Sequence, residues 1–257
     1  MTGRGPGPLS TGRAAMCQTD VMNVTSTSPA GRPGGRNSRF QAGLVATAML
    51  LFAAGAAALP IDLPVAGWCK AHRLPGELDR LIHLLEISGH SLGAALGLLA
   101  AVTLDRGLRF PLPVRGGVGA RNFTRMIAAT YLGGLVVDVI KLCVERVRPR
   151  AADLAGVASW FGTFGTGSLA TPHTRASDLM SFPSGHSAVA AGLAAALAWR
   201  YPHGWPLFAF LAAATAAQRV ISSAHYPSDV ACGAAVGLLG AALCLGRNTL
   251  EPDGGSC

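Results

Sequence analysis

The chain has 257 residues, of which 50% are apolar and 13% are charged, and its mean hydropathy is +0.39. Soluble domains average about 25% charged residues, so this composition indicates a chain that lies largely in a membrane. The formal net charge is +8, but the basic residues form no stripe with interleaved aromatic residues. The sequence therefore predicts a lipid bilayer as partner and no nucleic acid.

The first 40 residues are rich in Gly, Pro, Ser, Thr and Arg and have no hydrophobic period, which predicts a disordered cytoplasmic tail over residues 1–40. Six apolar segments follow, each near the ~20 residues that cross a ~30 Å hydrocarbon core as a helix. Their approximate ranges are 41–59, 88–104, 124–143, 184–200, 204–221 and 228–246. We therefore expect an all-α fold, a six-span transmembrane helical bundle over residues 41–246, with a short cytoplasmic tail at 247–257.

The first apolar segment also allows a second interpretation. From Arg39 to Ala58 it has the basic flank, the apolar stretch and the small terminal residues of a cleaved signal peptide, although it is long enough to remain as a span. Both interpretations place the chain at a cell membrane. The heavy use of Ala, Gly and Arg indicates a GC-rich bacterial genome.

The arginines set the expected orientation. Five lie in the N-terminal tail and five in or beside the loop between the second and third segments: Arg4, Arg13, Arg32, Arg36, Arg39, and then Arg106, Arg109, Arg115, Arg121 and Arg125. The positive-inside rule makes both regions cytoplasmic. Six spans then return the C-terminus to the cytoplasm and place residues 144–183 and 222–227 outside. We expect a multi-pass protein of a bacterial inner membrane whose site opens on the extracytoplasmic side.

Cysteines and glycines in the apolar segments predict packing without chemistry. The six cysteines show no C-x-x-C pair and no metal-ligand spacing, which indicates neither a disulfide framework nor a zinc site. Gly93-x3-Gly97 and Gly233-x3-Gly237 lie within predicted spans, where small residues let helix backbones approach closely.

Polar residues at the ends of the apolar segments form three motifs, and the first is Lys141-x6-Arg148-Pro149. Residues seven apart return to nearly the same helix face about 10 Å further along, so both cations can address one site before Pro149 ends the helix. Only two lysines, Lys70 and Lys141, stand among the 21 basic residues, so a lysine here favours a specific role. Snorkelling to lipid headgroups is the alternative. Asp138, one turn earlier, is the expected partner of Lys141.

The second motif is Pro183-Ser184-Gly185-His186. Proline suits the first turn of a helix, and glycine lets a ligand approach the backbone. The first amides of the helix would point unpaired at the site, where the helix dipole also favours an anion such as phosphate. The alternative is a simple helix cap followed by an interfacial histidine. Ser88-Gly89-His90 repeats the tripeptide without the proline and is interpreted as a helix start only.

The third motif, Arg219-x5-His225-x3-Asp229, combines a cation, a histidine and a carboxylate. Four residues separate His225 from Asp229, with Pro227 at a first-turn position, so the carboxylate can reach the imidazole. A carboxylate on one ring nitrogen fixes the tautomer and leaves the other nitrogen as a nucleophile or base. A capped helix with an incidental histidine would also fit this motif alone. Three such motifs at the ends of membrane helices together favour a site for phosphoryl transfer.

The three motifs resemble the signature of the type 2 phosphatidic acid phosphatase superfamily, which reads K-x6-R-P, P-S-G-H and S-R-x5-H-x3-D. The resemblance covers roughly residues 88–246, including the expected helical core. It departs at one position, where Gln218 stands in place of the serine before Arg219. The superfamily also includes vanadium haloperoxidases and acid phosphatases, and its integral-membrane branch implies hydrolysis of a phosphate monoester or diphosphate on a membrane lipid.

The resemblance implies a role for each motif residue. His225, held by Asp229, would attack phosphorus to form a phosphohistidine, and His186 would protonate the leaving oxygen. The remaining motif residues would hold the nonbridging oxygens: Lys141, Arg148, Ser184, Gly185 and Arg219. Arginines and amides would replace the usual magnesium, so no metal and no cofactor are expected.

Other functions compete with this interpretation. A vanadate-dependent haloperoxidase uses a similar pocket, but six spans argue against a soluble oxidase. An intramembrane serine hydrolase would pair Ser184 with His225, yet it would leave three cations without a purpose. A non-enzymatic lipid-binding protein is the plainest alternative. Within the phosphatase interpretation, phosphatidate, phosphatidylglycerophosphate, undecaprenyl diphosphate and lipid A phosphate all suit an interfacial site, and the connection 150–183 is long enough to form a lid.

Overall fold

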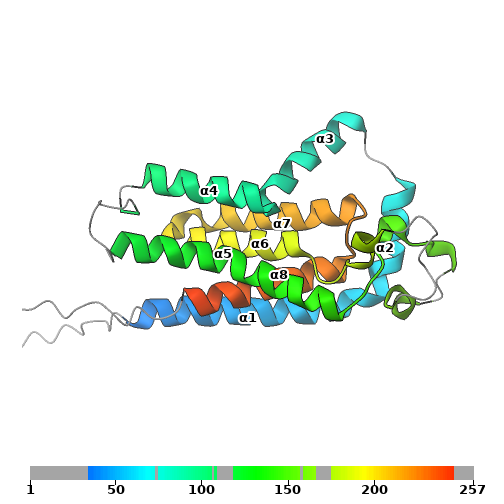
Figure 1. The fold of residues 1–257 in the computed structure, drawn as a ribbon, viewed down its shortest axis with the longest axis horizontal. Helices are drawn as coiled ribbons and strands as arrows, with labels where there is room; N and C mark the ends of the chain where they lie inside the picture. Colours follow the sequence, from blue (N-terminus) through cyan, green and yellow to red (C-terminus); the bar gives the residue numbers. More distant parts are fainter. Residues whose placement is uncertain are drawn as a thin grey trace, which may run out of the picture. The chain divides into compact units, whose positions relative to one another are not determined.

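The computed structural model describes residues 34–72, 75–105, 107–108, 118–156, 159–165 and 175–245. Eight α-helices occupy most of these residues (Figure 1): α1 (Gly34–Ala58), α2 (Asp62–Ala71), α3 (Gly76–Leu85), α4 (Ser91–Leu104), α5 (Val118–Cys143), α6 (Gly185–Arg200), α7 (Trp205–Ile221) and α8 (Pro227–Cys244). Short 3-10 turns join several of them, and isolated β-bridges are the only extended pairings among the described residues. The predicted all-α class is therefore confirmed.

Each of the six predicted apolar segments coincides with one helix of the structure: α1, α4, α5, α6, α7 and α8, in chain order. The first helix begins earlier than expected, because residues 34–40 of the predicted disordered tail already belong to α1. Residues 1–33 and 246–257, and with them the rest of both predicted tails, lie outside the described residues.

The sequence prediction did not include α2 and α3, which have ten residues each. α2 follows α1 after a 3-10 turn that contains Pro60, whose ring removes a backbone donor and so interrupts the helix. α3 alternates apolar and polar residues instead of being uniformly apolar, so it does not stand out as a span.

By length and composition, three helical stretches among the described residues are able to cross a membrane: Asn37–Ala71, Gly119–Cys143 and Pro227–Cys244. The chain is accordingly a multi-pass helical membrane protein. α4, α6 and α7 have 14, 16 and 17 residues, respectively. At 1.5 Å per residue they are shorter than the ~20 residues of a full crossing, so helix length alone supports fewer spans than the six predicted.

Helices α5, α6 and α8 pack against one another, and α1 lies along α8 (Figure 1). Glycines allow this close approach: a Cβ on Gly133 of α5 would lie 2.5 Å from the Cα of Gly237 in α8, and one on Gly237 would lie 2.2 Å from the carbonyl oxygen of Ala188 in α6. The packing predicted for Gly233-x3-Gly237 is therefore confirmed. In Gly93-x3-Gly97 only the first glycine allows a close backbone approach: a Cβ on Gly93 would lie 1.7 Å from the carbonyl oxygen of Ile87 in the turn before α4, whereas one on Gly97 would make an ordinary contact at 3.8 Å.

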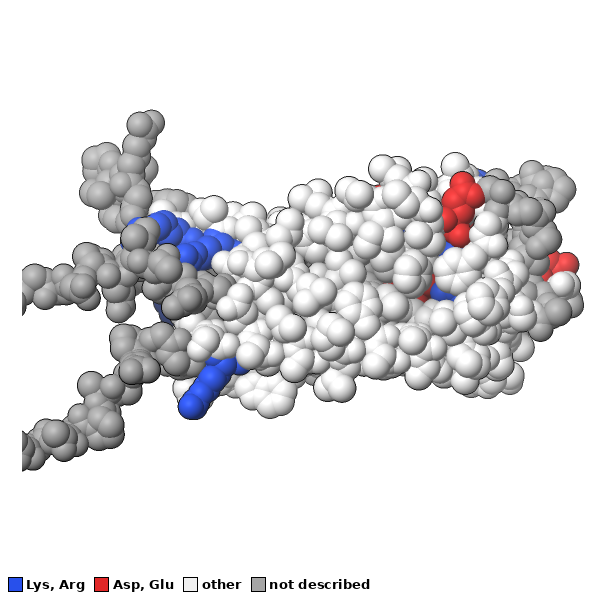
Figure 2. Space-filling view, turned by 90° about the horizontal axis from the view of Figure 1, so that it is seen from below, with Lys and Arg blue, Asp and Glu red and all other residues white. Residues whose placement is uncertain are grey.

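The long helices alternate in direction, so their ends gather at the two ends of the bundle. Exposed arginines such as Arg39 and Arg121 lie where α1 and α5 begin. Figure 2 shows Lys and Arg side chains at one end, a broad uncharged band in the middle and carboxylates toward the other end. The starts of α4, α6 and α8 meet the ends of α5 and α7 at that second end, and all three motifs lie there.

Candidate active site

The first motif lies at the end of α5 and in the segment that follows. Lys141 is in the last turn of α5, and its Nζ is 3.7 Å from Asp138 Oδ1. The same Nζ is 3.4 Å from the position that a Cβ on Gly185 would occupy, so the ammonium faces the start of α6. Arg148 donates from Nε to the carbonyl of Ser177 at 3.0 Å. Its two terminal nitrogens have no partner among the described residues, which leaves them available to an anion.

Backbone hydrogen bonds hold the segment that follows α5. The amide of Arg148 donates to the carbonyl of Asp178 at 2.7 Å, and the amide of Val147 donates to the carbonyl of Thr163 at 3.0 Å. Both acceptors belong to the connection 150–183, whose length allows it to form a lid. The described parts of this connection therefore support the first motif from the side and set the position of Arg148.

The second motif begins α6. Ser184 is the N-cap, since its Oγ accepts from the amide of Ser187 at 3.4 Å and from the Ser187 hydroxyl at 3.0 Å. The amides of Gly185 and His186 are the first of α6 and have no acceptor within the helix. Gly233 of α8 permits this arrangement, because a Cβ there would be 2.2 Å from the carbonyl oxygen of Ser184. An anion at these amides would meet the positive end of the helix dipole.

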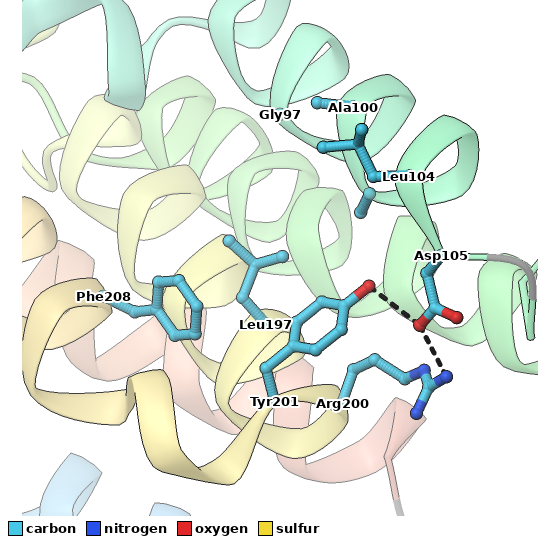
Figure 3. Close-up of a pocket in the computed structure, with 9 residues that line it drawn as sticks. Gly97, Ala100, Leu104, Asp105, Leu197, Arg200, Tyr201 and Phe208 are labelled. Carbon is cyan, nitrogen blue, oxygen red and sulfur yellow. Dashed lines mark hydrogen bonds and ion pairs between the residues drawn. The ribbon is translucent and has the colours of Figure 1, made fainter.

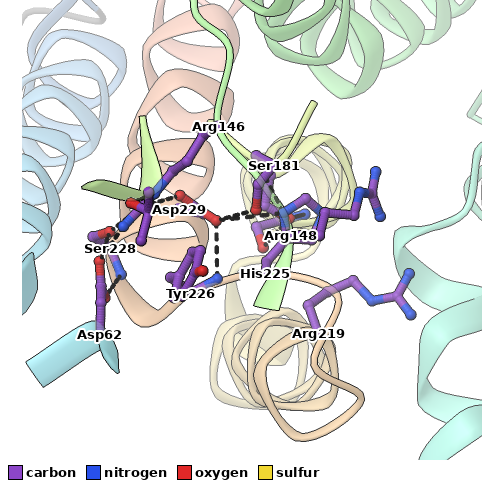
Figure 4. A network of polar contacts seen from close by, with 12 residues as sticks. Asp62, Arg146, Arg148, Ser181, Arg219, His225, Tyr226, Ser228 and Asp229 are labelled. Atoms are coloured by element: carbon purple, nitrogen blue, oxygen red, sulfur yellow. Dashed lines mark hydrogen bonds and ion pairs between the residues drawn. The ribbon is translucent and has the colours of Figure 1, made fainter. Parts of the chain in front are cut away.

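A tight turn joins α7 to α8 and carries the third motif. Ser223 adopts a left-handed conformation with φ of 53°, which is uncommon for a residue other than glycine. The amides of Ala224 and His225 both donate to the carbonyl of Arg219 at 3.1 Å. The arginine and the histidine are thus fixed to each other through the backbone. Figure 4 shows the guanidinium groups of Arg148 and Arg219 extending to the same side of His225.

His225 is 2% exposed, and one hydrogen bond determines its tautomer. Nδ1 lies 2.7 Å from the carbonyl oxygen of Ser181, which can only accept, so Nδ1 carries the proton. Nε2 therefore has the free lone pair, and no described residue donates a hydrogen bond to it. The expected pairing of Asp229 with the imidazole is present as an ion-pair contact, and the Ser181 carbonyl is the nearer partner of Nδ1. Asp229 Oδ2 is 3.7 Å from Nδ1, beyond hydrogen-bond range.

Asp229 supports the site through other contacts. It is the third residue of α8, and its Oδ2 accepts from the amide of the N-cap residue Tyr226 at 2.9 Å, half of a capping box. The same oxygen accepts from the Ser181 hydroxyl at 2.6 Å. Ser181 therefore links the carboxylate to His225, with its hydroxyl on one and its carbonyl on the other. Sequence reasoning missed Ser181, because it lies outside all three motifs.

Arg146 is fully buried and was also missed. Its Nη1 donates to Asp229 Oδ1, and its Nη2 donates to Asp62 Oδ2 at 2.7 Å (Figure 4). The guanidinium carbon lies 4.4 Å from the ring centre of Phe164 and 4.1 Å from that of Tyr226, so an aromatic ring packs against it on each side. Arg146 thereby ties the start of α8 to the start of α2.

Further hydrogen bonds satisfy both Arg146 and its partner Asp62. Asp62, the first residue of α2, is fully buried, and its Oδ1 accepts from the amide of Ser228 at 3.0 Å. Arg146 Nε donates to the hydroxyl of Thr163 at 3.0 Å. Buried charges persist when each is paired and hydrogen-bonded in this way. The sequence did contain a signal for this buried ion pair. Asp62 and Arg146 are charged residues beside apolar segments, where a buried charge needs a partner.

His186 faces a carboxylate that belongs to no motif. Its Nε2 is buried, has no hydrogen-bond partner among the described residues, and lies 3.6 Å from Glu86 Oε1. The same Oε1 accepts from Arg219 Nη1 at 2.8 Å. Glu86 begins the 3-10 turn Glu86–Gly89, so the segment interpreted only as a helix start also faces the site. His90 is the N-cap of α4, as expected, and its ring meets that of His186 edge-on, with centroids 5.8 Å apart.

The surroundings of His225 favour its neutral form. Burial lowers the pKa of His225, the negative charge of Asp229 opposes that shift, and the positive charges of Arg148 and Lys141 add to it. A neutral imidazole with Nε2 unprotonated is the form that acts as a nucleophile. The two cations therefore help to keep the adjacent imidazole uncharged.

All eight predicted site residues lie at one end of the bundle. They are His225, His186, Asp229, Lys141, Arg148, Ser184, Gly185 and Arg219. Ser184 serves as a helix cap, as its alternative interpretation held, and the cap leaves the hydroxyl hydrogen of Ser184 as one further donor. The geometry adds Ser181, Arg146, Asp62 and Glu86 to the residues that sequence reasoning proposed.

A hollow lies at the end of α6 opposite the candidate active site. It has a volume of about 630 Å³ and lies between α4, α6 and α7 (Figure 3). Apolar side chains such as Leu104 and Phe208 line most of it, and Asp105 pairs with Arg200 at its polar corner. Arg200 ends α6 while His186 lies in its first turn, about 20 Å away along the axis. This hollow contains none of the predicted site residues.

The fold and the site define a helical membrane protein with two histidines, three cations and the first amides of α6 gathered at one end of its bundle. The sequence profile of the PAP2 superfamily matches residues 122–249, and the chain belongs to this superfamily. The matched residues contain all eight predicted site residues and Arg146. Asp62 and Glu86 lie outside them.

Relatives of this chain include the lipid A 1-phosphatases of Rhizobium etli and Rhizobium johnstonii, which are 33% and 36% identical to it over 120 residues. The aligned part is 47% of this chain, and 46% and 43% of the respective relatives, so the chain spans less than half of their length. The crystal structure of a transmembrane PAP2-type phosphatidylglycerolphosphate phosphatase from Bacillus subtilis is 22% identical, with a TM-score of 0.53 over 79% of this chain and 93% of that one. At this identity the likeness establishes a shared fold.

Proposed function

We propose that the protein hydrolyses the phosphate of a membrane lipid, without a metal, through a phosphohistidine on His225. One observation carries the proposal. The Ser181 carbonyl holds Nδ1 of a neutral, buried imidazole at 2.7 Å, which leaves the lone pair of Nε2 available near Lys141 and Arg148. Such an arrangement suits attack on an anionic phosphoryl group, because the cations stabilise the charge that the nucleophile meets.

The reaction would have two steps. In the first, His225 Nε2 forms a bond to phosphorus while the bond to the leaving oxygen breaks, and His186 gives its proton to that oxygen. In the second, water gives a proton to His186 and attacks phosphorus, which releases phosphate and regenerates neutral His225. Arg148, Lys141 and the first amides of α6 would hold the equatorial oxygens throughout. The phosphoimidazole would be stabilised by Asp229, whose carboxylate lies 3.7 Å from Nδ1.

The proposed substrates carry a phosphate on the headgroup of a lipid. A site at the ends of the membrane helices would hold the phosphorus near the water interface while the acyl chains stay in the bilayer. The relatives named as lipid A 1-phosphatases support a lipid A phosphate as the substrate. Phosphatidate and phosphatidylglycerophosphate are lipid monoesters of the same chemical kind.

We further propose that six helices span an inner membrane and that the site faces its extracytoplasmic side. Exposed Arg39 and Arg121 lie at the end of the bundle away from the motifs, which agrees with the positive-inside rule. The 3-10 turns before α4 and α7 add length to these short helices. Reporter fusions after Arg115 should be cytoplasmic and those after Gly165 extracytoplasmic. The opposite pattern would place the site on the cytoplasmic face.

An intramembrane serine hydrolase fits the geometry less well. Ser184 is fully buried, and its Oγ accepts hydrogen bonds from Ser187 at the cap of α6. Among the described residues, no hydrogen bond joins Ser184 to His225. A serine nucleophile needs a base within hydrogen-bond reach, so this pair lacks the required contact.

Phosphate release by the purified protein from a panel of lipid phosphates tests the proposal. Activity should survive EDTA and be blocked by vanadate, which mimics the trigonal-bipyramidal transition state and should bind tightly. Loss in EDTA that magnesium restores would overturn the metal-free mechanism. Release from none of the lipids would favour a lipid-binding protein, and vanadate-dependent oxidation of bromide would favour a haloperoxidase.

A further inference from the structure

Glu86 places a carboxylate inside a site that is otherwise built for an anion. Its Oε1 accepts from Arg219 Nη1 at 2.8 Å, and its Oε2 accepts from Gln218 Nε2 at 3.3 Å. Two neighbouring residues at the end of α7 therefore hold both carboxylate oxygens. One of them is Gln218, the residue that departs from the superfamily motif and whose side chain is long enough to reach Glu86.

Arg219 is able to hold Glu86 and a phosphate together. Only Nη1 of its guanidinium bonds Glu86, and its Nε is buried with no partner among the described residues. A guanidinium has five N–H donors in a fixed plane. A phosphate bound to the other N–H donors of Arg219 would leave its bond to Glu86 in place. The Glu86 carboxylate would then lie next to the bound substrate.

The position of Glu86 relative to His186 fixes which part of the substrate lies beside it. Glu86 Oε1 is 3.6 Å from His186 Nε2. In the proposed function His186 passes a proton to the leaving oxygen, and we assign this step to Nε2. That nitrogen is buried and without a hydrogen-bond partner in the described part of the chain. Atoms attached to the leaving oxygen must therefore come close to the Glu86 carboxylate.

We propose that Glu86 selects lipid monoesters with an uncharged leaving group and rejects lipid diphosphates. The inference rests on the proposed function and narrows its substrate class. When a monoester of a sugar or glycerol reacts, the leaving group is a neutral alcohol, and its neighbouring O–H or N–H groups offer donors to Glu86. When a diphosphate reacts, the leaving group is a second phosphate, which would bring a negative charge against the carboxylate.

The size of the effect follows from the distance between like charges. Two unit charges a few ångströms apart in a partly buried site repel each other strongly, because the effective dielectric constant there is about 20 instead of 80. A like charge placed against the wrong ligand is a common means of rejecting that ligand. We expect a discrimination of at least about tenfold against the diphosphate.

Glu86→Gln tests the inference, because it removes the charge and keeps the shape. kcat/KM of the purified full-length protein should be measured for dioleoyl phosphatidate and for undecaprenyl diphosphate. The ratio of diphosphate to monoester activity should rise at least about tenfold in Glu86→Gln. Glu77→Gln is the matched control, since Glu77 is an exposed residue of α3 that pairs only with Arg80 among the described residues, and its ratio should equal that of the wild type.

The outcomes separate the inference from the proposed function. Activity in the wild type with an unchanged ratio in Glu86→Gln would overturn the selection by charge and leave the phosphatase proposal intact. A proportional fall on both substrates would mean that Glu86 only positions Arg219, which also overturns it. Absence of release from these two substrates and from every other lipid phosphate of the panel, in the wild type, would sink the proposed function itself.

Binding of inorganic anions gives a second readout that needs no turnover. Calorimetric titration of the purified protein should show that Glu86→Gln improves pyrophosphate binding relative to orthophosphate by at least about tenfold. Gln218→Ser, which restores the superfamily residue, removes a neutral donor and leaves the charge of Glu86 in place, so its ratio should stay near that of the wild type. Equal relative binding of the two anions in all three proteins would contradict the inference.

Discussion

The two histidines of the site lie at the same end of the bundle, yet their surroundings differ. His225 is 2% exposed, and its Nδ1 already has the Ser181 carbonyl as a partner. The side chain of His186 is 28% exposed, and its Nε2 has no hydrogen-bond partner in the described part of the chain. The side of the site that holds the proposed nucleophile is thus complete before substrate arrives, and the side that holds the proposed acid is not.

This difference follows from what packs around each histidine. The His225 side is enclosed by the start of α8, the segment after α5 and the start of α2, which Arg146 joins through Asp229 and Asp62. The His186 side is faced by the 3-10 turn before α4, which contributes Glu86, whose side chain is 31% exposed. A nucleophile gains from fixed geometry, whereas an acid meets its partner only when the leaving group is bound.

Replacement of His225 should have the largest effect, because it removes the nucleophile from the completed side. His225→Ala should lose at least about 10⁴-fold in activity and form no phosphoenzyme with any substrate. His203→Ala is the control, since His203 is an exposed histidine between α6 and α7 at the far end of the bundle. Rapid-quench trapping of labelled protein decides the matter. Acid-labile, base-stable label that persists in His225→Ala would assign the nucleophile to another residue.

Replacement of His186 should cost less, about 10²–10⁴-fold, because it removes only the acid. The loss should depend on the leaving group. An aryl phosphate needs little protonation and should be partly rescued in His186→Ala, whereas the same substrate should not rescue His225→Ala. Steady-state kinetics on a lipid phosphate and an aryl phosphate measures the contrast. Equal losses on both substrates would argue that His186 binds phosphate and does not act as the acid.

Disruption of the buried ion pairs of Arg146 should lower the free energy of unfolding more than disruption of a surface ion pair. Arg146→Ala leaves two buried carboxylates without their cation and should cost about 3–5 kcal/mol. Arg150→Ala breaks a pair with Asp178 in which the arginine side chain is 51% exposed, and it should cost no more than about 1 kcal/mol. Unfolding of both variants in the same detergent compares them. Similar losses in the two proteins would mean that the network around Arg146 contributes no more than a surface contact.

The parts of the site that could be predicted from the sequence are those that local structure determines. Ser184 and Asp229 occupy the first positions of helices, where caps and free amides follow from the chain within four residues. The spacing from Arg219 to His225 likewise lies within one helix end and one turn. The apolar segments predicted six helices for a related reason, since each buries backbone polar groups within itself.

The residues that were missed are joined by contacts between distant parts of the chain. Arg146 and Asp62 are 84 positions apart, and Glu86 and Arg219 are 133 positions apart. No spacing rule connects such pairs, so only the packing of the helices reveals them. The expected contact of Asp229 with His225 is present at 3.7 Å, but the nearer partner of Nδ1 could not be predicted, for the same reason. The Ser181 carbonyl comes from a different segment and takes the position beside Nδ1.

The smallest expected effect is a shift in the pH dependence of activity, and its sign tests the completed side of the site directly. Burial lowers the pKa of His225, so the imidazole should stay neutral below its ordinary pKa of about 6.5, and activity should fall only as pH drops further. Arg148→Gln removes a positive charge that lowers this pKa, so the acid limb of kcat/KM should move to higher pH. Asp229→Asn removes a negative charge that raises it, so the limb should move to lower pH. Arg150→Gln serves as the control and should leave the limb in place. All variants are compared on one substrate, so the ionisation of the substrate phosphate is the same in each profile. If the acid limbs of Arg148→Gln and Asp229→Asn moved in the same direction, a group other than His225 would be titrating.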